Sequence, residues 1–402
     1  MLDFMKIMGA FFLIVLMLRL KVPLYKAMLT SGLALGLVFG LSPQAIALTG
    51  AKSLVDLTTI TLASALTLIM FLENIMRRTK MLETMVTSLK NLIGNVRIVM
   101  AILPALVGLL PSAGGAVFSA PMVEEVSRDT NLSPEKKSFV NYWYRHVWEY
   151  IFPLYPSIIL AAQITELPMQ QLILFLVPYA VAAALMGIPI AFSGEKVVKK
   201  VEKTKANQEN WISFVGSIYP VIMIILAVLV VQINIAVSIG LVVFLLLLIN
   251  QYNIAQIKEL VQEAFSAEII LMVISVIVFK DILLQTGSVE TLPAFFASLG
   301  LPPELILILL PFAVGMATGM SQAFVATTFP ILLGMSANGV LPELAALAYV
   351  SGFMGVMLSP VHLCLILTVE VFRADLGKVY KMLLAPCSLQ MVLAVLLFIL
   401  MR

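Results

Sequence analysis

The sequence contains very little charge for its length. Only 12% of its 402 residues are Asp, Glu, Lys or Arg, whereas 61% are hydrophobic. Soluble domains are nearer one quarter charged and one half apolar. A soluble protein of this size would need far more polar surface. The composition therefore excludes an ordinary soluble fold.

Residues that build disulfides and metal centres are also scarce, with two cysteines and two histidines in the chain. Cys364 and Cys387 both lie inside apolar runs, which favours packing roles over a disulfide framework or a cysteine-based metal site. The two histidines, His146 and His362, do not occupy equivalent positions of the internal repeat described below. The sequence therefore predicts no metal site.

Several motifs of enzymes and ATP-driven proteins are absent. The chain has no GxxxxGK[ST] loop, so transport driven by ATP would need a partner. It has neither HExxH nor GxSxG, and no paired aspartates lie deep in two apolar runs. Basic residues do not interleave with aromatic ones as in nucleic-acid patches. We expect neither an enzyme nor a nucleic-acid-binding protein, and no bound cofactor.

Long apolar runs are what the sequence has instead, for example 57–72, 172–192, 212–231 and 379–401. A helix of about 20 residues crosses the ~30 Å hydrocarbon core of a bilayer. We therefore expect an all-α polytopic protein embedded in the lipid of the inner (plasma) membrane. The first run, 7–18, lacks a small-residue cleavage site, so we expect a retained helix and not a signal peptide.

The chain repeats itself at an offset of 207 residues. Residues 73–84, ENIMRRTKMLET, match residues 280–291, KDILLQTGSVET, at four positions. The same offset relates further residues: Leu103-Pro104 with Leu310-Pro311, Tyr142 with Tyr349, and Pro153 with Pro360. A constant offset that includes prolines and charged residues predicts a duplication. We expect a first repeat at 1–194, a polar cytoplasmic linker at 195–211 and a second repeat at 212–402.

The basic residues predict how each repeat crosses the membrane. Each repeat has a broken apolar segment, at about 98–122 and about 303–336. If both segments return as re-entrant hairpins, nearly all loop Lys and Arg residues lie on the side of the Lys-rich linker, as the positive-inside rule requires. We therefore predict two inverted repeats, each with five transmembrane helices and one re-entrant hairpin, and both termini outside.

The two hairpins contain residues that suit a binding site. Irregular backbone at membrane depth is tolerated only where protein or a water-filled cavity covers it. The first hairpin reads LLPSAGGAVFSAP at 109–121, and the second reads GMATGMSQAFVATTFP at 315–330. Each combines a break with neutral hydrogen-bonding groups, and each is followed by an interrupted helix, at about 140–165 and about 344–369.

Two hairpins and two discontinuous helices at equivalent places are typical of secondary transporters, which bind substrate and coupling ion between half-helix ends. Half-helix N-termini suit an anion, and carbonyls at a break can hold Na⁺. The candidate substrate-binding residues are Ser112, Gly114, Gly115, Ser119, Ser321, Gln322, Thr327, Ser359 and His362. The candidates for coupling to Na⁺ or H⁺ are Thr318, Gly319, Pro153, Pro360, His146 and Glu149.

Simpler interpretations stay open for some of these residues. Gly114 and Gly115 could serve only to let helices pack closely. His146 and Glu149 are three residues apart on one helix face and could pair structurally. Arg145 could anchor the helix at the membrane interface.

The hairpins and broken helices make the sequence resemble the ion transporter superfamily. This group includes divalent-anion:sodium symporters, citrate and gluconate permeases, and the large membrane subunits of tripartite carriers. The chain is similar in particular to an uncharacterised family of bacterial and archaeal membrane proteins, the DUF401 type. The resemblance implies an elevator mechanism, in which a transport domain slides against a dimeric scaffold domain.

The sodium–dicarboxylate members of that superfamily carry Ser-Asn-Thr at each hairpin tip. The matching places here are Ser112-Ala113-Gly114 and Ser321-Gln322-Ala323, so only the serines carry over. We expect an ion-coupled secondary transporter of a small, carboxylate-like anion that works as a homodimer. A membrane subunit of a multi-component carrier and a channel are the alternatives, and an intramembrane enzyme fits less well.

Overall fold

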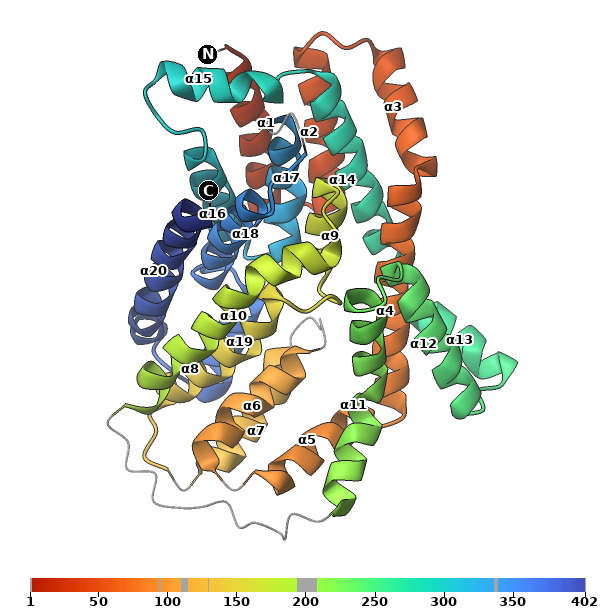
Figure 1. Ribbon diagram of the computed structural model, residues 1–402, viewed down its shortest axis with the longest axis vertical. Coiled ribbons are helices and arrows are strands. Elements are labelled where there is room, and N and C mark those ends of the chain that lie inside the picture. Colours follow the sequence, from red (N-terminus) through yellow and green to blue (C-terminus); the bar gives the residue numbers. More distant parts are fainter. Residues whose placement is uncertain are drawn as a thin grey trace.

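The computed structural model describes residues 2–93, 95–109, 115–128, 130–193, 208–335 and 339–401. This part of the chain forms twenty α-helices and two short 3₁₀-helices, and it contains no β-strand (Figure 1). The protein is therefore all-helical, as the sequence predicts.

The first half of the chain contains these helices: α1 (Leu2–Arg19), α2 (Leu24–Val38), α3 (Pro43–Val55), α4 (Leu57–Arg78), α5 (Met81–Leu92), α6 (Val96–Gly108), α7 (Gly115–Ser127), α8 (Pro134–Arg145), η1 (Val147–Tyr150), α9 (Pro156–Thr165) and α10 (Met169–Phe192). The second half contains these: α11 (Gln208–Leu229), α12 (Ile235–Ile249), α13 (Ile254–Ala264), α14 (Ala267–Gln285), η2 (Val289–Thr291), α15 (Leu292–Ser298), α16 (Leu305–Thr318), α17 (Ser321–Met335), α18 (Pro342–Met357), α19 (Leu363–Phe372) and α20 (Leu376–Met401).

The two halves contain equivalent helices in the same order. α9 begins at Pro156 and α19 at Leu363, while α10 begins at Met169 and α20 at Leu376. Both pairs keep the offset of the sequence repeat. The short helices α3, α5, α13 and α15 lie between the predicted spans and were not expected. α5 and α13 bury only one side, Met85 and Ser88 in α5 and Leu260 and Ala264 in α13, which is the spacing of amphipathic surface helices.

Contacts between the halves come in reciprocal pairs. α2 packs on α14, and its counterpart α12 packs on α4. In the same way α7 packs on α19 and α17 on α9, and α8 packs on α20 and α18 on α10. Figure 1 shows α6 and α7 in the lower part of the molecule and α16 and α17 in the upper part. Each half therefore contacts the other through equivalent elements.

Two equivalent glycines set the distance between each hairpin and the helix that follows it. A methyl group at Gly108 of α6 would overlap the carbonyl oxygen of Arg145 of α8. A methyl group at Gly315 of α16 would overlap the carbonyl oxygen of Gly352 of α18 in the same way. Because glycine has no side chain, α6 approaches α8, and α16 approaches α18, at backbone-to-backbone distance.

Two helices are interrupted near the centre of the molecule. In the first half, α8 is followed by η1 and then by α9, whose first residue is Pro156. In the second half, α18 ends at Met357 and α19 begins at Leu363, with Pro360 between them. Proline lacks the amide hydrogen that continues a helix, and it fits the first turn of a new one. The breaks therefore have a local cause in the sequence.

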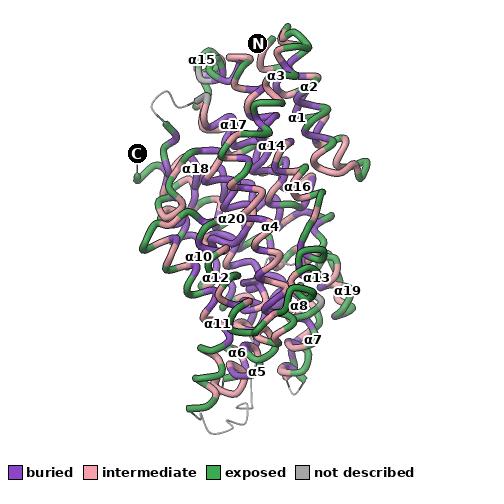
Figure 2. Tube along the Cα trace, turned by 90° about the vertical axis from the view of Figure 1, so that its right-hand side faces the viewer, coloured by how far each residue is buried: buried purple, intermediate pink, exposed green. Residues whose placement is uncertain are grey.

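The helices before the two breaks are deeply buried. All residues of α8 from 138 to 145 and of α18 from 345 to 357 are buried. Figure 2 shows buried residues along the middle of the molecule and exposed ones on its outside. A helix that is buried on every side belongs to a protein core, so the two broken helices form the centre of the fold.

The outside of the molecule is strongly apolar. Four helices of the described residues are long and apolar enough to cross a membrane, namely α4, α10, α11 and α20, and eight further apolar helices are shorter. Leu174 and Leu185 on α10 are 67% and 60% exposed. Large apolar surfaces are rare on soluble monomers. The apolar helices therefore indicate a membrane protein.

Candidate functional site

The turn of the second hairpin lies against the second helix break. α16 ends at Thr318, Gly319 and Met320 form the turn, and α17 begins at Ser321. Gly319 has a φ of +65°, a left-handed conformation that glycine adopts without steric cost. A methyl group there would lie 2.8 Å from the amide nitrogen of His362. Only glycine therefore lets the hairpin turn approach the start of α19.

A cavity of about 460 Å³ lies where this hairpin meets the two breaks. The hairpin contributes residues 318–322 and the second break residues 361–364. The first break contributes Arg145, Glu149, Tyr155, Pro156 and Ser157. Three elements that are far apart in the sequence thus enclose one space.

Three helices begin at this cavity. The first turns of α9, α17 and α19 contribute Pro156, Ser321 and Leu363 to its lining. The first amides of a helix have no acceptor within the helix and carry a partial positive charge. Arg145, only 3% exposed, adds a positive charge, and Glu149, 9% exposed, adds a carboxyl group. The helix ends and Arg145 therefore favour negative groups in the cavity.

A chain of polar contacts joins the three elements. Ser321 Oγ donates a hydrogen bond of 2.9 Å to Glu149 Oε2, and Glu149 Oε1 lies 3.8 Å from His146 Nε2. His146 Nε2 in turn lies 3.2 Å from His362 Nε2. His362 Nδ1 then contacts the carbonyl oxygen of Gly319 at 2.9 Å. The chain begins and ends on the hairpin turn and passes through both breaks.

Tyrosines cover the backbone carbonyls that the breaks expose. Tyr349 donates a hydrogen bond of 2.7 Å to the carbonyl oxygen of Glu149 and lies 2.8 Å from Ser157 Oγ. Its repeat equivalent, Tyr142, donates a hydrogen bond of 3.0 Å to the carbonyl oxygen of Met357. Buried carbonyls without partners are costly. Each tyrosine therefore stabilises the break in the opposite half.

The structure brings six of the predicted site residues to the cavity wall: Glu149, Thr318, Gly319, Ser321, Gln322 and His362. His146 does not line the cavity. Its Nε2 atom contacts Nε2 of His362, which does line the cavity. Their roles in binding stay predictions, because the structure shows only where they lie.

The other predicted residues lie elsewhere. Thr327 donates a hydrogen bond of 2.7 Å to the carbonyl oxygen of Ala323 in its own helix. Ser359 accepts a hydrogen bond of 3.3 Å from the amide of Val361 within the second break. Pro153 is buried in the first break, Pro360 is exposed in the second, and Ser119 is buried in α7.

The tip of the first hairpin falls largely outside the described residues. Ser112 and Gly114 belong to the part that is not described, and Gly115 is the first residue of α7. Their part in a binding site stays a prediction.

Eight cavity residues were not among the predicted site residues, and four of these have a polar side chain or a thiol. Arg145 is buried in the fold and is part of the cavity wall. Tyr155, Ser157 and Cys364 also line the cavity. Ser157 and Cys364 each occupy the second position of a helix that starts at a break. Their place at the start of a helix that follows a break was the one feature of the sequence that could have identified Ser157 and Cys364.

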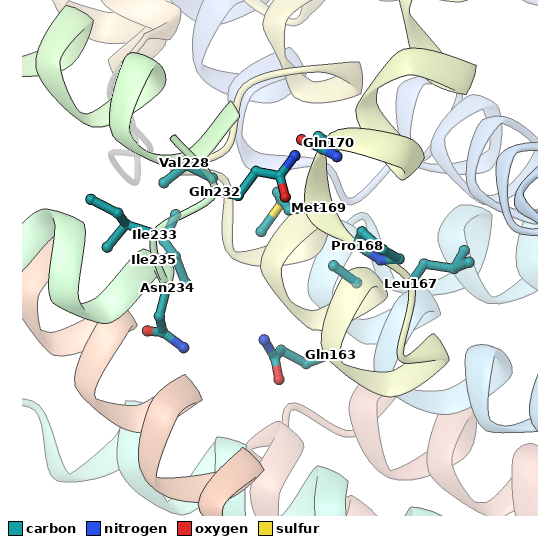
Figure 3. Close-up of a pocket in the computed structure, with 11 residues that line it drawn as sticks. Gln163, Leu167, Pro168, Met169, Gln170, Val228, Gln232, Ile233, Asn234 and Ile235 are labelled. Carbon is teal, nitrogen blue, oxygen red and sulfur yellow. The ribbon is translucent and has the colours of Figure 1, made fainter. Parts of the chain in front are cut away.

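A second cavity, of about 270 Å³, lies between the α9–α10 and α11–α12 turns. Figure 3 shows the amides of Gln163, Gln232 and Asn234 in the space between these turns. Its lining residues carry no charge. Asn234 also caps α12 by accepting a hydrogen bond of 2.9 Å from the amide of Ala236. A charged solute therefore fits the first cavity better.

The apolar helices around a buried polar cavity define an all-helical protein of the membrane type. The chain belongs to the family described as proteins of unknown function, DUF401, whose family model matches residues 7–401. No curated protein matches the chain.

Proposed function

We propose that the protein is an ion-coupled secondary transporter of a small, carboxylate-like anion. The observation that carries this proposal is the cavity at which α9, α17 and α19 begin beside Arg145. Helix N-termini bind anions through their amides, and arginine binds carboxylates through two parallel hydrogen bonds. The volume of about 460 Å³ lies in the range of small-molecule sites.

The arrangement of the halves supports alternating access. Reciprocal contacts such as α2 on α14 and α12 on α4 are expected of two repeats related by a two-fold axis, as inverted repeats are. The two hairpins come from opposite parts of the molecule (Figure 1). We include in the proposal an elevator-type movement of hairpins and broken helices against a dimeric scaffold, and an inner-membrane location with both termini outside.

Transport into liposomes tests this proposal. The purified protein is reconstituted, and uptake of labelled lactate, succinate and citrate is measured with a Na⁺ gradient, a proton gradient or neither. We expect saturable accumulation of at least one of them under one gradient only. Flux that is independent of a gradient and does not saturate would indicate a channel, and no flux of any carboxylate would contradict the proposal.

Two matched variants locate the site. Gln322→Leu removes an amide from the anion cavity, and Gln163→Leu removes one from the second cavity. We expect Gln322→Leu to lower uptake at least about tenfold, since one lost hydrogen bond to a charged group costs roughly 1.5–3 kcal/mol. We expect Gln163→Leu to transport at the wild-type rate. Equal uptake rates in the two variants would show that the hairpin turn takes no part in the binding site.

A further inference from the structure

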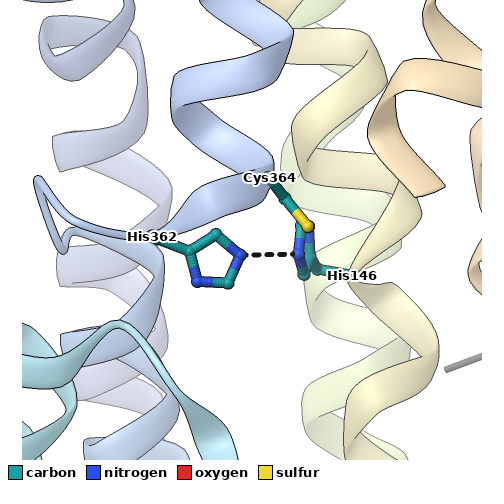
Figure 4. Close-up of side chains that lie close together, drawn as sticks. All are labelled: His146, His362 and Cys364. Atoms are coloured by element: carbon teal, nitrogen blue, oxygen red, sulfur yellow. Dashed lines mark hydrogen bonds between the residues drawn. The ribbon is translucent and has the colours of Figure 1, made fainter. Parts of the chain in front are cut away.

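We propose that His146, His362 and Cys364 bind a divalent transition-metal ion of the Zn²⁺ type at the contact between the two broken helices. The ligand atoms of these three residues all lie within 4.8 Å of one another. His146 and His362 are buried and Cys364 is half-buried. Figure 4 shows the three side chains converging from the two breaks. Metal binding at this place does not depend on the proposed transport.

The hydrogen bonds of the two histidines determine which ring nitrogens carry hydrogen. His146 Nδ1 lies 2.5 Å from the carbonyl oxygen of Tyr142, and His362 Nδ1 lies 2.9 Å from the carbonyl oxygen of Gly319. A carbonyl oxygen only accepts, so each Nδ1 carries the hydrogen and donates it. The two Nε2 atoms of the neutral rings therefore present lone pairs.

These two lone pairs face each other. The Nε2 atoms are 3.2 Å apart (Figure 4), and two acceptors cannot form a hydrogen bond with each other. A cation between the two Nε2 atoms would accept both lone pairs. An Nδ1–H held by a carbonyl, with Nε2 left for the ion, is also the arrangement of most metal-binding histidines. The two Nε2 atoms can therefore bind either a proton or a metal ion between them.

The third ligand favours the metal ion. Zn–N bonds of about 2.0–2.1 Å place two ligating nitrogens of a tetrahedral site roughly 3.3–3.4 Å apart, close to the separation observed here. Cys364 supplies sulfur, which together with imidazole suits Zn²⁺. On binding, its thiol gives its proton to water in the cavity and bonds the metal as thiolate.

Two negative groups near the site can offset the charge of a divalent ion. Glu149 Oε1 lies 3.8 Å from His146 Nε2, so its carboxylate and the Cys364 thiolate together offset the two positive charges. Arg145, on the cavity wall, is a positive charge that opposes the ion, so both negative groups are needed to hold it. His362 and Cys364 also line the cavity, which gives the ion a path to the site. A fourth ligand would come from Glu149 or from a molecule in the cavity.

Cobalt binding tests the proposal without any transport measurement. Co²⁺ is added to the purified full-length protein in detergent, and the visible and near-ultraviolet absorption is recorded. We expect one equivalent of Co²⁺ to produce the bands of a tetrahedral site together with a thiolate-to-cobalt charge-transfer band. We expect Zn²⁺ to displace it and to raise the thermal unfolding temperature.

Substitutions identify the ligands. We expect Cys364→Ser to abolish the charge-transfer band and His362→Ala to weaken Co²⁺ binding at least about tenfold. Cys387→Ser, which alters the other cysteine, should leave the spectrum unchanged. Should a variant unfold, X-ray absorption of the zinc-loaded wild type still reports nitrogen and sulfur ligands at the metal.

Two results would overturn the proposal. One is folded wild-type protein that binds no Co²⁺ or Zn²⁺ at stoichiometric concentration, in which case the histidines share a proton. The other is a cobalt spectrum that Cys364→Ser does not change. Neither result would affect the transport experiment, so the two proposals can fail separately.

Discussion

Gly108 and Gly315 show what single residues decide in this fold. Each lies in the first helix of a hairpin and contacts a backbone carbonyl of the helix that follows the hairpin, Arg145 for Gly108 and Gly352 for Gly315. The equivalent contact occurs twice, at the offset of the repeat. Close approach of this kind is how small residues join helices in membranes.

The substitution Gly315→Ala therefore has a definite expected effect. The added methyl group overlaps backbone, which cannot rotate away, so α16 and α18 must separate. We expect a loss of about 1–3 kcal/mol of stability, as for other overpacked cores. The measurement is thermal unfolding followed by tryptophan fluorescence.

Gly216 is the matched control for this substitution. It lies inside α11, and a methyl group there meets no atom within 4 Å. Because alanine favours a helix by about 0.5–1 kcal/mol over glycine, Gly216→Ala should unfold at or above the wild-type temperature. If Gly315→Ala unfolds at the same temperature as Gly216→Ala, the close contact does not contribute to stability.

At the scale of whole elements, the start of α8 is held to the start of α20. Ser133 caps α8 by accepting a hydrogen bond of 3.3 Å from the amide of Lys136. Glu135 accepts a hydrogen bond of 3.5 Å from the amide of Asp375 and lies 3.8 Å from Lys378 Nζ. The pKa of Glu135 is lowered from 4.5, first by its own backbone amide and further by Ser133, the Asp375 amide and Lys378, against the opposing effect of burial.

A lowered pKa in the folded state links the stability of this contact to pH. The ionised Glu135 stabilises the fold fully above its unfolded pKa, and this contribution disappears as the pH falls through the folded pKa. We expect Glu135→Gln to lower stability by up to about 1 kcal/mol at pH 7. The difference from wild type should vanish at the acid end of a series of thermal unfolding curves from pH 7 downward.

The control for this series is Glu343→Gln. Glu343 lies in the first turn of α18, the counterpart of α8. We expect Glu343→Gln to lower stability less than Glu135→Gln at pH 7, because among the described residues Glu343 has no counterpart of the contacts with the Asp375 amide and Lys378. An effect of Glu135→Gln that stays the same from pH 7 to the acid end would contradict the electrostatic explanation.

At the scale of the whole molecule, α3 and α13 follow equivalent helices, α2 and α12, in the two halves. α3 packs on α14, and α13 packs on α4, the counterpart of α14. If the halves are inverted repeats, these two equivalent helices lie on opposite sides of the membrane. Exposed lysines on each of them, Lys52 on α3 and Lys258 on α13, make the arrangement testable.

We expect Lys52→Cys to react with a membrane-impermeant maleimide in intact cells, and Lys258→Cys to react only after permeabilisation. The wild type, with Cys364 and Cys387, gives the background labelling. Reaction of both positions from the same side would show that the halves are parallel, and the predicted hairpins would then have to cross the membrane.

Much of the local structure follows from particular residues. The apolar runs predict helices, Pro156 and Pro360 predict the helix breaks, and Gly319 permits the turn of the second hairpin, because each of these effects acts within a few residues. Which residues meet at the cavity could not be predicted in this way. His146 and His362 contact each other although 216 residues separate them. Cys364 looked like a packing residue, since its neighbours in sequence are apolar.

By itself, the sequence determined that the protein is helical and that its helices are apolar enough for lipid, and it predicted a duplication whose two halves are interrupted at equivalent places. These properties depend on composition and on backbone chemistry within a few residues. Only the tertiary structure decided that both breaks and one hairpin turn enclose a single cavity, and that Arg145, Glu149, His362 and Cys364 meet there. Which side chains meet depends on how the buried helices α8 and α18 pack, and that packing is a property of the whole chain.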